Sequence, residues 1–271
     1  KKTPFYLQLS HYAIHSNLMM TKKSYEKYSK KEKGKIHDNI GLGAMTEDLD
    51  HSVGLIMDKL KELGIENNTY IIYSSDNGSV PIIVPRRYYK QSYNYPLSRG
   101  KWDAMEGGIR VPMIISGPNI EPNSFSDTNI SFSDLLPTII DIISSKKIKD
   151  KSLDGGSFKK ILFGKSKKIK RTTNGLIFHV PYENGIALKR AHSAIIQDNY
   201  KLVKFYDNNE IKLFDLNADI FEKNDLSQKK GKIAKRMEAS LMDYLSAVKA
   251  PKWQTGITWK QKTLKKINSF H

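Results

Sequence analysis

The chain has 271 residues, of which 39% are hydrophobic, so it holds enough apolar material for a packed core and is not a disordered tail. Its 45 Lys and Arg against 28 Asp and Glu give a formal net charge of +17, a balance that favours anionic partners. No apolar run approaches the roughly 18 residues that a membrane-spanning helix needs, and the absence of Cys excludes disulfides and thiolate metal sites.

The basic residues gather in four runs among polar residues. These runs are Lys22–Lys35, Lys146–Lys151, Lys165–Arg171 and Lys260–Lys266. Any single run of this kind is more often a solvated loop or helix face than a binding surface. Nucleic acid, anionic lipid and sulfated glycan would all suit a charge of this sign, and nucleic acid ranks lowest because the sequence contains no recognisable nucleic-acid-binding motif.

The N-terminal residues pass directly from the polar turn Lys1–Pro4 into the apolar run Phe5–Leu9. This stretch has neither an initiator Met nor the apolar region of a signal peptide. We therefore expect further coding sequence upstream, and any targeting signal would lie there.

Strands and helices alternate in the first part of the chain. The expected strands are 4–10, 69–74 and 111–116, and the expected helices are 42–63 and 133–143. Gly64 is placed to end the first helix, and Ser131 or Ser133 to begin the second. Such alternation predicts an α/β fold built on a three-layer sheet with parallel strands.

The pattern changes beyond a polar, glycine-containing segment, 146–170, which we interpret as a linker. Short strands at close spacing are expected over 176–179, 191–197, 201–206 and 211–216, followed by a helix over about 233–248. This pattern predicts a small antiparallel meander packed with a helix. We therefore expect one domain over 1–165 and an α+β subdomain over 166–271.

Asp76 and Asn77 directly follow the strand expected over 69–74, at the carboxyl end where open α/β sheets bind ligands. A carboxylate beside an amide oxygen suits calcium or magnesium better than zinc. Gly78 permits the backbone turn that would let both side chains reach one ion. Taken alone, the tetrapeptide is more often an Asx turn, and two ligands do not complete such a site.

Lys101 lies in a glycine-bearing loop shortly before the strand expected over 111–116, where an ammonium would suit a tetrahedral oxyanion. His11 and His15 follow the first expected strand, where an imidazole can donate a proton or a hydrogen bond. Each signal is weak by itself, since most loop lysines and histidines are ordinary polar residues. Together they fall at strand ends of one expected sheet.

In their order along the chain, several motifs resemble the formylglycine-dependent, arylsulfatase-like sulfatases of the alkaline-phosphatase-like superfamily. The matching pieces are Pro4–Leu7 with Ala13–His15, Ala44–Leu60, Ser75–Gly78, Pro96–Trp102 with Glu106–Pro112, Asp134–Thr138, Leu153–Gly155, Tyr200–Val203 and Leu213–Leu216. No single piece is decisive, but their ordered combination is specific and covers nearly the whole chain.

The resemblance implies roles for individual residues. Asp76 and Asn77 would be calcium ligands, Lys101 would contact the sulfate, and His15 would contact the sulfate or the leaving-group oxygen. His179 would be a further substrate contact, whereas His11 has no counterpart that we can assign. The family's nucleophile, a formylglycine made from Cys or Ser in a Cys/Ser-x-Pro-Ser/Ala-Arg motif, and two more acidic metal ligands would lie upstream of Lys1.

The implied function is that of a sulfuric ester hydrolase in the periplasm or outside the cell, with a sulfated carbohydrate as the expected substrate. Tyrosines in 88–95 would stack on its sugar rings or pack against the meander. We expect no turnover by this chain alone, because its Ser-x-Pro runs, Ser79–Pro81 and Ser116–Pro118, continue into Ile82 and Asn119 and not into the Ser/Ala-Arg of that motif. The alternatives are a zinc phosphatase or phosphodiesterase of the same superfamily, or a non-catalytic polyanion-binding remnant; the oligomeric state stays open.

Overall fold

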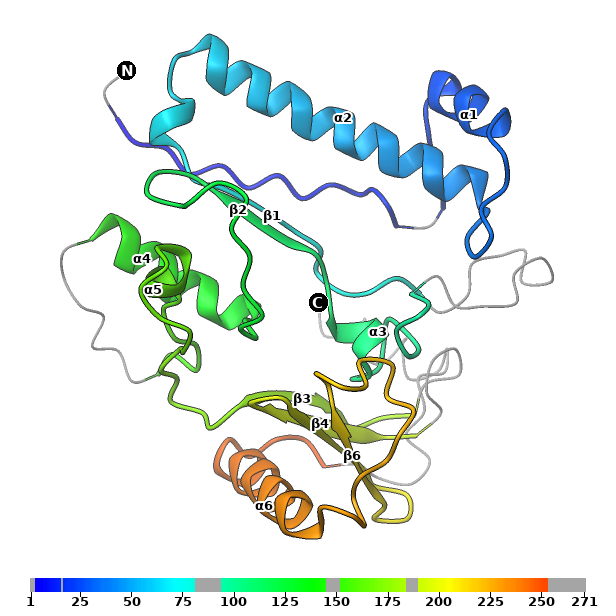
Figure 1. Cartoon of the computed structure of the whole chain (residues 1–271), viewed down its shortest axis with the longest axis vertical. Coiled ribbons are helices and arrows are strands. Elements are labelled where there is room, and N and C mark those ends of the chain that lie inside the picture. The colour runs from blue at the N-terminus through cyan, green and yellow to red at the C-terminus, as the bar shows by residue number, and fades with distance from the viewer. Residues whose placement is uncertain (1–2, 16, 81–93, 145–151, 184–189, 253–271) are drawn as a thin grey trace, which may run out of the picture. The chain divides into compact units, whose positions relative to one another are not determined.

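The computed structural model of the chain describes residues 3–15, 17–80, 94–144, 152–183 and 190–252 (Figure 1). The chain forms two compact units. Unit 1 comprises Lys1–Tyr70 and Ile83–Gln91, and unit 2 comprises Ile71–Ile82 and Ser92–His271. The domain boundary expected at residue 165 stays a prediction.

Unit 1 contains the helices α1 (Lys22–Ser29) and α2 (Ile40–Glu62), which pack against each other, and the short 3-10 helix η1 (Glu66–Asn68). The Asp48 carboxylate joins the two helices, because it accepts hydrogen bonds from the Thr21 backbone at 2.7 Å and from the Ser24 hydroxyl at 2.5 Å. Gly64 ends α2 in the left-handed conformation with a φ of 64°, as predicted for a C-cap glycine.

Residues 4–10 form no strand in the described part of the chain, so the expectation of a buried strand there is wrong. The side chains of Phe5, Tyr6 and Leu7 are 59%, 76% and 60% exposed. An apolar run becomes a strand only when a neighbouring backbone pairs with it, and no described segment does so.

Unit 2 begins with a two-stranded sheet in which β1 (Ile71–Ser74) and β2 (Met113–Ser116) pair antiparallel. The expected parallel pairing is wrong. Parallel neighbours need a crossover that carries the chain back to the start of the first strand. Here the Gly78 N–H donates to the Gly108 carbonyl at 2.9 Å, so the residues just before β2 lie beside the carboxyl end of β1. From that point β2 runs in the direction opposite to β1.

The next elements are the 3-10 helix η3 (Phe132–Asp134) and the helices α4 (Leu135–Ile143) and α5 (Lys159–Leu162). Ser131 begins η3 with a reciprocal capping box to Asp134, which confirms Ser131 as the cap. The fully buried Asp134 carboxylate also binds the Arg171 guanidinium at 2.7 and 2.8 Å. The segment expected as a linker, 146–170, therefore includes a short helix, and an anchoring arginine follows it directly.

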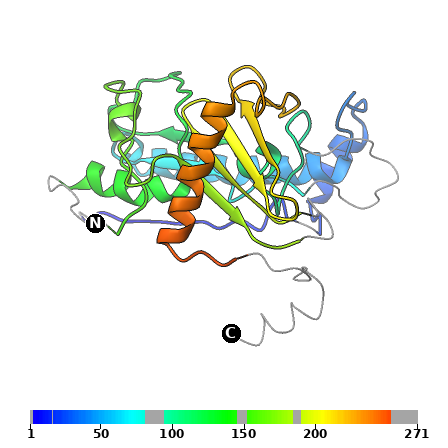
Figure 2. The ribbon, with the colours of Figure 1, turned by 90° about the horizontal axis from the view of Figure 1, so that it is seen from below.

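Four strands form the C-terminal sheet. They are β3 (Leu176–Val180), β4 (His192–Gln197), β5 (Tyr200–Phe205) and β6 (Ile211–Asp215), antiparallel and adjacent in chain order. The helix α6 (Gly231–Ala247) crosses one face of this sheet (Figure 2). The predicted meander and closing helix are confirmed.

The C-terminal sheet is buried on both faces, as the alternation along β5 shows. Leu202 packs toward α6, where the buried side chains include Met237 and Leu241. Val203 points to the opposite face and packs with Ala104 and other residues of the segment before β2. The sheet is therefore the platform on which residues 98–110 rest. In the described ranges, no helix combines the length and apolar character needed to cross a bilayer.

Candidate active site

Asp76 and Asn77 lie just beyond the end of β1, with Asp76 exposed and Asn77 half-buried. The Ser75 hydroxyl donates to the Asn77 carbonyl at 2.9 Å, which fixes the turn after the strand. Within the described ranges, neither the Asp76 carboxylate nor the Asn77 amide has a hydrogen-bonding partner or ion pair. Both groups therefore keep their oxygen atoms available for a ligand.

Main-chain hydrogen bonds join the segment after β1 to the lysine loop, which we define as residues 98–108 and which includes the start of the short helix α3 (Glu106–Ile109). The Lys101 N–H donates to the Ser79 carbonyl at 2.9 Å. The Asn94 side chain reinforces this junction, because its amide oxygen accepts from the Ser79 N–H at 2.9 Å and its amide nitrogen donates to the Ser79 carbonyl at 2.8 Å. The structure thus brings together two motifs that are more than twenty residues apart in the sequence.

Glycines make this junction close. A Cβ on Gly78 would lie 1.7 Å from the Gly107 carbonyl oxygen, and a Cβ on Gly107 would lie 2.5 Å from the Ser98 carbonyl oxygen. Gly78 does not have a positive φ. The missing Cβ of Gly78 therefore matters here because it lets two main-chain segments touch.

Lys101 is half-buried within a tight turn of the lysine loop. Arg99 and Trp102 flank it with φ values of 62° and 79°, in a region that non-glycine residues rarely adopt. The ammonium lies 5.8 Å from the centre of the Trp102 ring, and no described carboxylate pairs with it. Its charge is therefore available to an anion.

Comparison with known proteins decides what these motifs belong to. The profile of the family described as Sulfatase matches residues 1–145. The chain belongs to the sulfatase family. A second profile, described as N-sulphoglucosamine sulphohydrolase, C-terminal, matches residues 101–251 of this sulfatase chain.

Curated relatives of this sulfatase chain include a protein named Sulfatase from Formosa agariphila, 29% identical over 94% of this chain and 48% of that protein. Another is the steryl-sulfatase of Homo sapiens, 32% identical over 66% of this chain and 29% of that protein. The N-acetylglucosamine-6-sulfatase of Bos taurus is 36% identical over 44% of this chain and 19% of its own length. The chain spans about half the length of the Formosa agariphila protein and a smaller share of the other two relatives.

Solved structures share the fold. Ps i-CgsB in complex with k-i-k-neocarrahexaose has a TM-score of 0.75 and 22% identity, and the match covers 100% of this chain and 57% of that one. BT4656 in complex with its substrate D-glucosamine-2-N,6-O-disulfate has a TM-score of 0.56 and 24% identity, over 78% and 40% of the two chains. The expected sulfatase fold, an α/β part followed by an antiparallel sheet with a helix, is confirmed.

The calcium expected for this sulfatase requires hard oxygen donors, and Asp76 and Asn77 supply only these. Their lack of hydrogen-bonding partners among the described residues also fits metal binding. Calcium takes roughly six to eight oxygens, so this pair supplies part of a site. Among the described residues, no group of three or more His, Asp or Glu is placed to hold a metal.

The histidines lie in different environments. His11 and His15 belong to unit 1, where both are exposed and the His15 N–H donates to the Tyr12 carbonyl at 2.8 Å. His179, on β3 in unit 2, lies 2.6 Å from the Ser193 hydroxyl through Nδ1 and 2.7 Å from the Pro251 carbonyl through Nε2. Substrate contact by His179 would require it to leave one of these partners. The roles of His15 and His179 stay predictions, and the tyrosines of 88–93 lie outside the described residues.

Beneath the lysine loop, the sheet presents polar side chains that sequence reasoning did not identify as functional. His192 is fully buried, and its Nδ1 lies 2.7 Å from the Arg190 carbonyl while its Nε2 accepts from the Ala104 N–H at 2.9 Å. Because a carbonyl can only accept, Nδ1 carries the proton and the ring is neutral. Burial lowers the pKa of His192 to about 4, with the positive charges of Lys201, Arg99 and Arg190 acting in the same direction.

The buried His192 predicts a dependence of stability on pH. Its folded pKa of about 4 lies below the ordinary value of 6.5, so the unfolded chain binds the proton first as pH falls. The free energy of unfolding should therefore decrease between about pH 6.5 and pH 4, by on the order of 3 kcal/mol from this group. Urea unfolding across this range, compared between the wild type and His192→Gln, measures the contribution.

The His192→Gln variant should lose that part of the pH dependence, whereas His11→Gln, at an exposed position, should retain it. The carboxyl groups of Asp103 and Glu222, whose pKa values burial raises, act in the opposite direction in both proteins and cancel in the difference. Equal slopes for the wild type and His192→Gln would show that His192 is not the titrating group.

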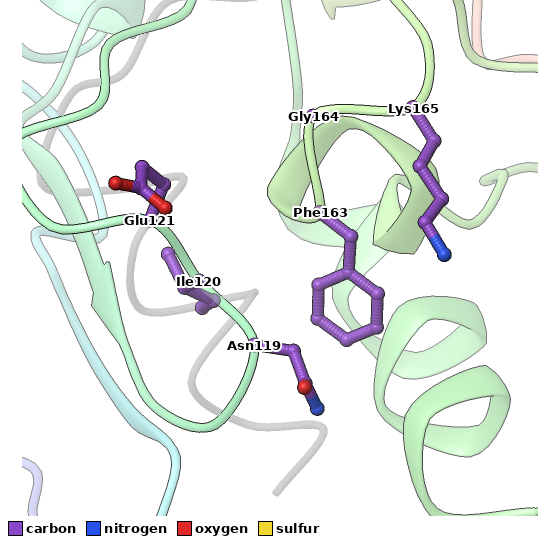
Figure 3. A pocket seen from close by; sticks show the side chains of 6 residues that line it. All are labelled: Asn119, Ile120, Glu121, Phe163, Gly164 and Lys165. Atoms are coloured by element: carbon purple, nitrogen blue, oxygen red, sulfur yellow. The ribbon is translucent and has the colours of Figure 1, made fainter.

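A separate hollow in unit 2 has a volume of about 720 Å³ (Figure 3). One wall is formed by Asn119, Ile120 and Glu121, and the other by Phe163, Gly164 and Lys165. None of the predicted site residues lines it. It is therefore distinct from the junction that carries Lys101.

Proposed function

We propose that this chain supplies the metal-binding strand end and the sulfate-binding lysine of a sulfuric ester hydrolase that acts on a sulfated carbohydrate. The main support is the junction in unit 2, where the Lys101 N–H bonds to the Ser79 carbonyl and so lies beside the segment that begins with Asp76 and Asn77. Family membership and the +17 charge support the reaction class and a polyanionic substrate. The names of relatives such as N-acetylglucosamine-6-sulfatase favour a sugar sulfate.

In this proposal each residue has a defined part in the reaction. A sulfate monoester is an anion whose spectator oxygens must be neutralised while sulfur is attacked. Lys101 holds one of these oxygens with its ammonium, which no carboxylate of the described residues pairs. Asp76 and Asn77 hold calcium, which supplies further positive charge when bound. His15 donates a hydrogen bond or proton to the departing alkoxide.

The proposal also predicts that the isolated chain does not turn over substrate, because it contains neither Cys nor a Ser-x-Pro-Ser/Ala-Arg motif. The formylglycine nucleophile and two more acidic ligands are assigned to sequence outside these 271 residues. Hydrolysis of an aryl sulfate by the isolated chain would contradict this assignment. Following the family resemblance, we also propose a periplasmic or extracellular location, which reading the gene upstream of Lys1 for a signal peptide would test.

Replacing Lys101 with alanine should weaken the binding of glucosamine 6-sulfate by roughly tenfold or more, because a charged hydrogen bond contributes on the order of 1.5–3 kcal/mol. Binding is measured by NMR titration at 150 mM NaCl with calcium present. Unsulfated glucosamine should bind equally weakly to the wild type and to the variant.

Lys165→Ala is the matched control, since it removes one positive charge from an exposed lysine far along the chain. If both variants lose affinity equally, and binding falls steeply with salt in both, general polyanion attraction explains the binding instead. If Lys101→Ala retains wild-type affinity, Lys101 is not the sulfate contact.

A further inference from the structure

Beneath the lysine loop, unit 2 buries a cluster of charged side chains that has no part in the proposed chemistry. Lys201 on β5 is completely buried, and its ammonium lies 3.0 Å from Glu106 Oε1 and 2.7 Å from Glu222 Oε1. Glu106 is 1% exposed and also receives a hydrogen bond from Arg110 Nε at 2.6 Å. Two cations thus face the two buried carboxylates, the buried Lys201 and the partly exposed Arg110.

The cluster holds main chain as well as side chains. Glu222 Oε2 accepts from the Glu106 N–H at 2.8 Å, and His192 accepts from the Ala104 N–H two residues earlier. Glu106 and Ala104 belong to the lysine loop, whereas the residues that bind them come from the C-terminal sheet and from the segment after β6. The loop is therefore fixed from below by directional contacts at neighbouring positions.

Hydrophobic residues in these positions would give the protein similar or greater stability, because the free energy of desolvating a buried ion pair offsets much of its electrostatic attraction. The hydrogen bonds that these charged groups make are directional, so they specify one position of the loop. Glu222 Oε1 faces the ammonium without the alignment of a hydrogen bond, while Oε2 is aligned on the Glu106 N–H. This geometry fits a role for the Glu222 carboxylate in orienting the main chain of the lysine loop.

The same loop is bound on its other side to the candidate site. The Gly107 N–H donates to the Ser98 carbonyl at 2.7 Å, and the Gly108 carbonyl accepts from the Gly78 N–H at 2.9 Å. A displacement of Glu106 would therefore move both ends of the junction, namely Lys101 and the turn after Asp76 and Asn77.

We propose that Lys201, through its contacts with Glu106 and Glu222, is a positioning residue that fixes the lysine loop for sulfate binding by Lys101. This inference rests on the proposed function. The C-terminal sheet then takes a direct part in forming the site, because successive side chains of β5 point alternately toward the lysine loop and toward α6.

The alternation along β5 provides a matched pair of variants. Lys201 faces the lysine loop, whereas Lys204 faces α6 and pairs with Glu238 at 2.6 Å. Lys201→Met should lower the affinity for glucosamine 6-sulfate by about tenfold, and Lys204→Met should change it less than about twofold. Hydrogen exchange at the Lys101 and Gly78 amides should accelerate in Lys201→Met alone.

A double-mutant cycle with Lys101→Ala separates positioning from general loss of structure. If Lys201 acts through Lys101, adding Lys201→Met to Lys101→Ala should leave the already weakened affinity unchanged. Should Lys201→Met fail to fold, Glu222→Gln decides the question, because it keeps an acceptor for the Glu106 N–H and removes only the charge facing Lys201.

The outcomes distinguish this inference from the proposed function. Wild-type affinity and amide protection in Lys201→Met, or in Glu222→Gln where the first variant does not fold, would overturn the positioning role. Loss of affinity in Lys101→Ala alongside that result would leave the proposed function standing. If Lys101→Ala itself binds glucosamine 6-sulfate normally, the proposed function fails. Faster exchange at the Lys101 amide in Lys201→Met would then still support the part of the inference that concerns the position of the lysine loop.

Discussion

Gly78→Ala is expected to destabilise unit 2 by about 3 kcal/mol and to separate the two halves of the candidate site. An added Cβ would lie 1.7 Å from the Gly107 carbonyl oxygen and 2.8 Å from its carbon. Both are main-chain atoms, which cannot rotate away as a side chain can. The lysine loop or the turn after β1 must therefore shift, and the hydrogen bond from Gly78 to Gly108 is lost.

Urea unfolding and amide hydrogen exchange measure this effect. The Lys101 N–H, which bonds to Ser79, should exchange faster in Gly78→Ala, and affinity for glucosamine 6-sulfate should fall with it. Gly231→Ala is the control within the same unit, because nothing lies within 4 Å of its added Cβ and it sits at the first position of α6. That change should be neutral or stabilising by less than about 1 kcal/mol. Equal stability of the two variants would refute the close approach.

The sequence predicted local elements well where the hydrophobic period and the capping residues agree. The helix around Leu42–Leu63 with Gly64 beyond it, and the meander with its closing helix, were confirmed within a few residues. These elements depend on contacts close along the chain, which periodicity and turn residues encode directly.

Strand pairing was predicted less well. Whether residues 4–10 form a strand, and whether β1 and β2 run parallel, depends on which backbone lies alongside, and no local pattern carries that information. The position of Asp76 and Asn77 at a strand end was confirmed, because it follows from the strand itself. The antiparallel direction follows from the Gly78 junction, which only a structure reveals.

The supporting residues were the hardest to predict. Lys201 was noted within the motif Tyr200–Val203, but a lysine between apolar neighbours in a strand normally predicts an exposed edge or face. The signal that would have found it is the apolar alternation on both faces of β5, which leaves no solvent face for the side chain. A buried lysine requires carboxylates, and Glu106 is the acid that the site motif itself supplies.

Asp134→Ala is expected to lower the stability of unit 2 by about 3–5 kcal/mol, because it removes one partner of a buried ion pair. The Asp134 carboxylate is fully buried and accepts from the Ser131 N–H at 2.8 Å, from the Gly156 N–H at 2.9 Å and from Arg171. Without it, two main-chain donors and a guanidinium whose side chain is only 12% exposed lose their acceptor.

The control for Asp134→Ala is the surface pair of Asp207 and Arg190, which has the same bidentate geometry between a carboxylate and a guanidinium. Asp207 accepts from Arg190 at 2.8 Å through each carboxylate oxygen, but its side chain is 39% exposed. Asp207→Ala should cost less than about 1 kcal/mol, since water replaces the lost partner. Urea unfolding of both variants gives the comparison, and similar losses would contradict the role of burial. In the part of the chain that the structure describes, no hydrogen bond of Asp134 reaches the lysine loop. Affinity for glucosamine 6-sulfate, measured at low temperature, should therefore survive in Asp134→Ala, which would show that this family motif has a structural role.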